Sequence, residues 1–392
     1  MSQALLDLAS SPAVLASVDR TGFNIGWDHA RHGLVPPAEL LLDGTPLGQG
    51  WRAGKAVFGR RPLATRRATR LWLELRTLAW RRGTAYGTQL TPEYLAQIHV
   101  VRCPVLRTPL GGAAGQAAAA VVDCLNPQAG YVCGNVAVLS QQAAEARRNI
   151  SVIEALRRSH QWSDGTSTRL TTMVGAAADA SKPVHAVDAA EGLGSVAWLR
   201  LAVLRSFATK LPFHEAARLP LALLPPSRVR LLNVPQRLQT LLTLQFTTKG
   251  WSTRTRSIAA LLPEHTLRQD FNLFVGALAP RVLEATPLHI GMRSALEDAW
   301  LNERVQRRWQ HLVFSLGEAA TSVLLERSEA AGMGIVGSAS HDNCQAVEGW
   351  ALGEGRQPLQ PRLVRPIAKP STSGLPLTVC ERPRSAASGW PG

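Results

Sequence analysis

Hydrophobic positions recur at helical spacing through most of the chain, and short apolar runs typical of strands occur in one region. Apolar residues three and four apart indicate helices over 62–82 and in a series of segments between 196 and 359. The strand-like runs fall within 120–140, where VVDC and NVAVLS flank a turn-rich stretch. The pattern predicts a mainly α fold with a small ββα element, in which an α+β N-terminal domain precedes an all-helical domain.

Residues suited to helix ends mark several boundaries. Pro62 suits the first turn of the 62–82 helix, and Gly83 lies just beyond its end. Thr91, followed by proline, is typical of the N-cap of a short second helix. Ser140 is placed to cap a long helix over 141–159. These signals predict three helices around the strand-like region.

Shifts in composition divide the chain into five parts. Small and polar residues dominate one internal stretch, which predicts a linker, and proline and serine dominate the C-terminal end, which predicts a disordered tail. The predicted parts are an N-terminal extension of helices and loops (1–50), a ββα domain with a basic helix (51–160), a linker (161–195), a helical domain of unassigned role (196–359) and the tail (360–392).

Positive charge is concentrated before the strand-like region. The chain has a formal net charge of +15, and the stretch from Trp51 to Arg82 carries ten basic residues against a single acid, Glu74. Clustering of this kind favours a polyanion such as DNA, whereas scattered arginines would reflect codon usage. The candidate backbone contacts are Arg60, Arg61, Arg66, Arg67, Arg70, Arg81, Arg82, Arg147 and Arg148. A solvated helix face is the alternative interpretation of these residues.

The cysteines and the apolar segments bear on the compartment. Five cysteines occur with no CxxC pair, which predicts reduced thiols and argues against both a disulfide framework and a zinc knuckle. No basic leader precedes an apolar run at the N-terminus, and no apolar run has the length of a membrane span. We therefore expect a cytoplasmic protein without a membrane partner.

Two polar residues in 120–140 are placed as a nuclease site requires. A one-metal ββα nuclease needs a ligand for a hard cation, a base that activates water, and a helix that supports the hairpin. Asp123 ends the first strand and is the candidate metal ligand, while Asn135 starts the second and is the candidate orienting residue. Both types also favour turns, so a purely local role is the alternative.

Several short motifs in this order resemble HNH-type endonucleases, in particular a bacterial and phage branch of uncharacterised members. The motifs are LTPEYL at 90–95, RCP at 102–104, VVDC at 121–124 and GYVCGNVAVLS at 130–140. DHARH at 28–32 and GWRAGKAVFGRR at 50–61 are similar to segments that precede this core in the same branch. The resemblance covers about residues 25–150.

The resemblance implies a catalytic pair and a divalent metal. By position, Asp123 would bind Mg²⁺ or Mn²⁺ and Asn135 would orient the site. The sequence departs from the family at Cys124, where the family has arginine or a histidine base, and at Ala144, where it has asparagine. A thiol is a poor base for water. Cleavage and binding without cleavage therefore both remain open.

Other residues are candidates for accessory roles. His29 and His32 lie one helical turn apart, and His99 precedes the RCP turn, so each is a candidate to support the site. Cys124 is an accessory candidate as well, although a small buried residue is the commoner role of such a cysteine. For the histidines the alternative is a structural or phosphate-contacting role.

Three functional hypotheses follow from the sequence. The first is an HNH-like protein that binds nucleic acid, DNA in particular, with metal-dependent phosphodiester cleavage. The second is a nucleic-acid-binding module that has lost turnover. In the third, the helical domain mediates protein interactions and the nuclease fold is a relic. The first two predict binding that weakens steeply with salt, and the third does not.

Overall fold

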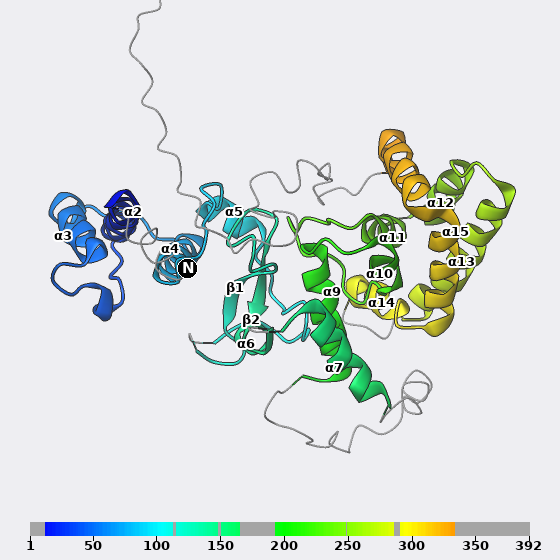
Figure 1. Ribbon diagram of the computed structural model, residues 1–392, viewed down its shortest axis with the longest axis horizontal. Helices are drawn as coiled ribbons and strands as arrows, with labels where there is room; N and C mark the ends of the chain where they lie inside the picture. The colour runs from blue at the N-terminus through cyan, green and yellow to red at the C-terminus, as the bar shows by residue number, and fades with distance from the viewer. Residues whose placement is uncertain are drawn as a thin grey trace, which may run out of the picture. The chain divides into compact units, whose positions relative to one another are not determined.

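The computed structural model describes residues 12–112, 115–147, 150–164, 193–247, 249–285 and 291–333. Most of the predicted linker, the predicted tail, Arg148, Cys344 and Cys380 lie outside these residues. The described chain is mainly helical with one two-stranded antiparallel sheet, as the sequence predicts in outline (Figure 1). None of the described helices combines the length and the apolar content that a membrane crossing requires.

The described residues of the first half of the chain form six α-helices and two strands. In chain order these are α2 (Pro12–Arg31), α3 (Pro46–Phe58), α4 (Arg67–Arg81), α5 (Pro92–Gln97), β1 (Ala120–Cys124), β2 (Val136–Ser140), α6 (Gln141–Arg147) and α7 (Val152–Asp164). The second half contains α9 (Ser195–Phe207), α10 (Phe213–Arg218), α11 (Val234–Leu244), α12 (Trp251–Ala260), α13 (His265–Ala285), α14 (Met292–Ala299) and α15 (Glu303–Ser328).

Glycines allow α2 and α3 to cross with their backbones in contact. A Cβ atom on Gly26 would lie 1.9 Å from the carbonyl oxygen of Leu47, and one on Gly50 would lie 1.9 Å from that of Phe23. Farther along α3, Gly54 faces Ala30 in the same way. Gly50 and Gly54 of the GWRAGKAVFGRR segment are therefore explained by helix packing, because only glycine permits this approach.

The basic helix begins five residues later than predicted. Pro62 lies in a loop before α4 rather than in its first turn, and the N-cap residue is Arg66. The loop is bonded to the end of α2 instead of to itself, since the Leu63 amide donates to the Arg31 carbonyl at 2.8 Å and the Thr65 hydroxyl donates to the His32 carbonyl. These contacts hold the segment out of helical conformation.

A small two-stranded antiparallel sheet lies where the sequence predicts the strands, and α6 follows it. β1 and β2 pair antiparallel with Asp123 opposite Ala137, and they lie side by side as the two arrows of Figure 1. Thr91 caps α5 as predicted, because its hydroxyl accepts the Tyr94 amide at 3.3 Å. Ser140 accepts the Ala143 amide at 3.3 Å. The predicted 141–159 helix is divided in two.

The division of that helix has a local cause. α6 ends at Arg147, and α7 begins at Val152 after a second capping residue. This residue is Ser151, whose hydroxyl accepts the Glu154 amide at 3.1 Å. Within α7, Glu154 pairs with Arg158 at 3.2 Å, which is the i, i+4 spacing that supports a helix. The apolar pattern continues without a break across this point. Ser151, a second N-cap serine, nevertheless starts a new helix here.

The sheet separates two hydrophobic cores. Val136 and Val138 of β2 pack with Leu75 and Ala79 of α4 in the smaller core. Alternate residues of the same strand face the other way and join a larger cluster, which also holds most of the buried residues of α9, α11, α13 and α15. The predicted ββα and helical regions thus share one core, and they lie in one compact unit.

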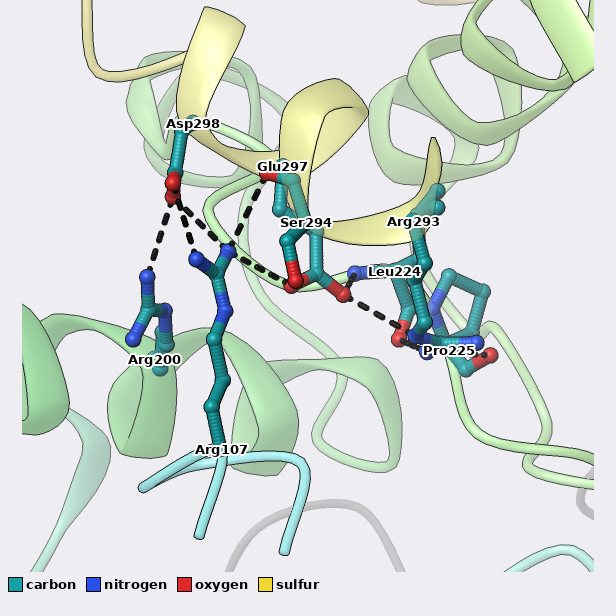
Figure 2. A network of polar contacts seen from close by, with 8 residues as sticks. All are labelled: Arg107, Arg200, Leu224, Pro225, Arg293, Ser294, Glu297 and Asp298. Atoms are coloured by element: carbon teal, nitrogen blue, oxygen red, sulfur yellow. Dashed lines mark hydrogen bonds and ion pairs between the residues drawn. The ribbon is translucent and has the colours of Figure 1, made fainter. Parts of the chain in front are cut away.

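A partly buried polar network fixes the RCP turn to the helical region. Arg107 has a left-handed backbone (φ 59°), and its guanidinium pairs with Asp298 at 2.7 Å and with Glu297 at 2.8 Å, both on α14 (Figure 2). Arg200 of α9 approaches the same Asp298 carboxylate at 3.0 Å. Glu297 also accepts the Leu224 amide at 3.0 Å. Charge-assisted bonds of this kind have defined geometry, so the turn and α14 are held together.

Candidate functional site

Asp123, the candidate metal ligand, is engaged by an arginine. It lies on the sheet face that carries Ala137, and this face belongs to the larger core. Arg147 at the end of α6 donates from Nη2 to Asp123 Oδ1 at 2.6 Å, and its Nε forms an ion pair with Oδ2. The Arg147 side chain is only 7% exposed. A guanidinium therefore occupies the position from which a cation would approach both carboxylate oxygens.

A second arginine increases the positive charge around Asp123. Arg205 of α9 is buried, and its Nε donates to the Leu125 carbonyl at 3.3 Å. Burial and the nearby Arg147 lower the pKa of Arg205 to about 10, against the opposing effect of Asp123. Burial also raises the pKa of Asp123, while Arg147 acts in the opposite direction. Two guanidiniums around one carboxylate leave a net positive site, which disfavours a divalent cation.

Cys124 points into the opposite core and away from this carboxylate. Its side chain is buried in the smaller core together with Val122 and Val138. Burial, and to a lesser extent Asp123, raises the pKa of the Cys124 thiol. A thiol of this kind is protonated at neutral pH and is a weak base. The described chain also contains no group of three histidine, cysteine or acidic residues placed to hold a metal ion.

Asn135 holds a turn. Its side chain is fully buried, and its Oδ1 accepts the Asn126 amide at 2.9 Å. Its Nδ2 donates to the Asn126 carbonyl at 2.8 Å and to the Gly130 carbonyl at 2.7 Å. These three bonds use most of the capacity of the amide. The geometry matches the local turn role that the sequence analysis gave as the alternative.

Within the described residues, none of the candidate histidines forms a hydrogen bond or an ion pair with Asp123. His29 is buried where α2 meets α4, with its Nε2 3.2 Å from the Thr77 hydroxyl, and the neighbouring Asp28 pairs with Arg76 at 2.5 Å. His32 lies one turn later and is half-buried, and His99 is exposed. The ion-pair partner of Asp123 in the described chain is an arginine. The DHARH segment thus connects two helices, which is the structural role weighed for it.

The buried His29 predicts a loss of stability in acid. Burial, followed by Arg76, lowers its pKa from 6.5 to about 4. The unfolded chain therefore binds a proton first as pH falls, and the stability present above pH 6.5 is lost between the two pKa values. Between pH 7 and 4.5 we expect His29 to account for about 2–3 kcal/mol of this loss. Urea denaturation of the wild type and of His29→Gln at both pH values measures it, and parallel losses in the two proteins would refute it.

The candidate phosphate contacts divide into two groups. Arg147 is buried against Asp123, Arg81 pairs with Glu39 at 3.2 Å, and Arg148 lies outside the described residues. The others are exposed and make no ion pair with a described acid, namely Arg60, Arg61, Arg66, Arg67, Arg70 and Arg82. Five of these six lie between the end of α3 and the first turns of α4. We call Arg60, Arg61, Arg66, Arg67 and Arg70 the arginine cluster.

Sequence reasoning did not identify Arg205 or Arg107. Arg205 lies in an apolar helical pattern far along the chain from Asp123, and Arg107 lies in a turn with no recognisable signal. An arginine within a helix that is otherwise apolar, such as Arg205 in VAWLRLAVLRSF, is a usable hint of a buried ion pair. The identity of its partner depends on the tertiary fold.

Comparison with known proteins adds no assignment to these residues. Neither models of protein families, nor curated proteins, nor solved structures gave a match to the chain. The role of the chain therefore has to be inferred from its own side chains, and the buried Asp123–Arg147 pair and the exposed arginine cluster are its two principal candidate features.

Proposed function

We propose that this protein binds nucleic acid, with DNA as its partner, through the arginine cluster. The observation that carries the proposal is that all five arginines of the cluster are exposed, and that among the described acids only Glu74, near Arg70, and Glu93, near Arg66, act on them. Exposed arginines that repel one another destabilise a fold unless anions approach them. A phosphate backbone supplies such anions at regular spacing.

The start of α4 supports an anionic partner. The N-cap residue Arg66 makes no capping bond through its side chain, and the first turn contains no acid. Backbone amides at a helix start carry partial positive charge, so acids are favoured there and arginines are disfavoured. Arg66, Arg67 and Arg70 therefore add positive charge where the helix itself is already positive. A bound phosphate would offset both effects.

Cleavage is not part of the proposal. The Asp123 carboxylate is paired with Arg147, and Cys124 lies in the smaller core with a raised thiol pKa. Metal-dependent hydrolysis requires a carboxylate free to bind the cation and a base near water. The ββα order of β1, β2 and α6 agrees with descent from an HNH-like scaffold. We therefore infer a scaffold of this kind that serves for binding.

Removal of the arginine cluster is expected to weaken DNA binding and its dependence on salt. Each lost phosphate contact reduces the slope of log K against log salt by about 0.9. Alanine at Arg60, Arg61, Arg66 and Arg67 should thus flatten the slope by about 3–4 units and weaken binding at least about tenfold. Fluorescence anisotropy with a labelled duplex at several salt concentrations measures both quantities.

The control removes the same amount of charge elsewhere. Exposed arginines in the second half of the chain, replaced together by alanine, serve for this purpose: Arg218, Arg256, Arg304 and Arg327. Equal losses in both quadruple variants would show a general charge effect and refute the cluster as the site. Supercoiled plasmid incubated with Mg²⁺ or Mn²⁺ should be retarded without being nicked. Nicking that a chelator and Asp123→Ala both abolish would instead establish a nuclease.

A further inference from the structure

The segment Arg60–Arg67 places one exposed leucine between two pairs of arginines. Its sequence is RRPLATRR, and all four arginines are exposed. The Leu63 side chain between them is 47% exposed. Leu63 is not among the buried residues of either core, and its neighbours Pro62 and Ala64 are exposed as well. Exposure of its apolar surface to water is unfavourable, and a partner that covered this surface would remove the unfavourable contribution.

This exposed segment is held in place by its backbone. The Leu63 amide donates to the Arg31 carbonyl at 2.8 Å, and the Thr65 hydroxyl donates to the His32 carbonyl. Pro62 lies against Gly33, whose φ of 63° and lack of a Cβ atom permit this contact. The loop is thus anchored through its backbone, while about half of the Leu63 side chain remains exposed. A preordered loop loses little conformational entropy when it binds.

α4 itself is not free to enter a DNA groove. Thr77 on one side contacts His29 of α2, and Leu75 and Ala79 on another side lie in the smaller core. Glu74 interrupts the exposed strip that remains. A recognition helix in the major groove needs a whole face free of other elements. The accessible part is therefore the loop and the helix start, which carry the arginine cluster.

We propose that the segment Arg60–Arg67 enters the minor groove of duplex DNA, with its arginine pairs along the groove and Leu63 as an apolar wedge between base pairs. This inference rests on the proposed function and specifies its substrate. The minor groove is too narrow for a helix but admits an extended loop, and its negative potential attracts arginine. Proteins that bind there insert apolar side chains such as leucine and bend the duplex.

An anionic membrane is the competing partner for a basic loop with an exposed leucine. Binding at a membrane surface normally uses a continuous apolar face along an amphipathic helix. Here a single leucine lies in a loop and is flanked on both sides by charged residues. A single leucine between charged residues suits a narrow groove with negative potential better than the continuous hydrocarbon layer of a membrane. Vesicles therefore enter the experiment as an alternative probe.

The test uses the full chain and an A·T-rich duplex labelled at both ends. Anisotropy gives the affinity, and energy transfer between the end labels reports bending. Leu63→Ser should bind about tenfold more weakly with an unchanged salt slope, because one buried leucine is lost and no phosphate contact. It should also lose the bend. The control is Val101→Ser, since Val101 is 74% exposed and lies outside the segment, and this variant should match the wild type.

Two further arms identify the groove and the partner. Netropsin, a minor-groove ligand, should displace the protein, whereas methyl green, a major-groove ligand, should not. If binding depends on the arginine cluster but resists netropsin, or if Leu63→Ser matches Val101→Ser, the groove assignment fails and the proposed function stands. A preference for single strands overturns the groove assignment in the same way. If phosphatidylserine vesicles are bound and DNA is not, both proposals fail.

Discussion

Replacing Arg147 with methionine is expected to lower the free energy of unfolding by about 3–5 kcal/mol. The substitution leaves the Asp123 carboxylate, whose side chain is 14% exposed, without its partner in a mostly apolar surrounding. Arg205 lies nearby and offsets part of the charge, but its Nε donates to the Leu125 carbonyl and not to Asp123. A buried charge that loses its partner costs more than the pair contributed. Urea denaturation at neutral pH measures the loss.

Two variants separate this effect from a general loss of charge. Arg157→Met removes an exposed arginine that pairs with Glu154 at 3.7 Å, and we expect a change within about 0.5 kcal/mol. The double variant Asp123→Asn, Arg147→Met should recover part of the stability, since no unpaired carboxylate remains. If Arg147→Met proves as stable as Arg157→Met, the Asp123–Arg147 ion pair does not stabilise the fold. The hypothesis that Asp123 binds a metal would then have to be reconsidered.

Local sequence signals predicted the helices and strands near the site, but not the burial or the charge partners of the side chains that they carry. Thr91 and Pro92 identify the start of α5, and the short apolar runs in 120–140 identify the two strands, because these signals act over a few residues. The environment of Asp123 depends on Arg147 and Arg205, which lie farther along the chain. A motif gives the type and order of residues. It gives neither burial nor distant charge partners.

The division into domains is a second feature that local composition predicts only in part. The fall in apolar content across 161–195 indicates a linker, but composition does not report whether the flanking segments pack together. Leu139 of β2 and Leu201 of α9 belong to the same buried cluster. Arg107 joins the RCP turn to α14 through ion pairs. The helical region thus covers the sheet face that carries Asp123, which no property of the linker indicates.

The α2–α3 crossing predicts the second large effect, because Gly50 has no room for a side chain. A Cβ atom there would lie 1.9 Å from the Phe23 carbonyl oxygen, which is backbone and cannot move away by a change of rotamer. Gly50→Ala must therefore separate the two helices. We expect it to lower the free energy of unfolding by about 3 kcal/mol, at the upper end for overpacking. Thermal denaturation and hydrogen exchange of α2 and α3 measure the change.

This variant also tests how the arginine cluster is held. The loop before α4 is bonded to the Arg31 and His32 carbonyls at the end of α2, so separation of α2 from α3 should loosen the loop and weaken DNA binding. Gly276→Ala on α13 is the matched control, because a Cβ atom there meets nothing within 4 Å. It should leave binding unchanged and stabilise the helix by roughly 0.5–1 kcal/mol. Unchanged stability of Gly50→Ala would contradict the close crossing of α2 and α3. Unchanged DNA binding would mean that the conformation of the loop before α4 does not depend on this crossing.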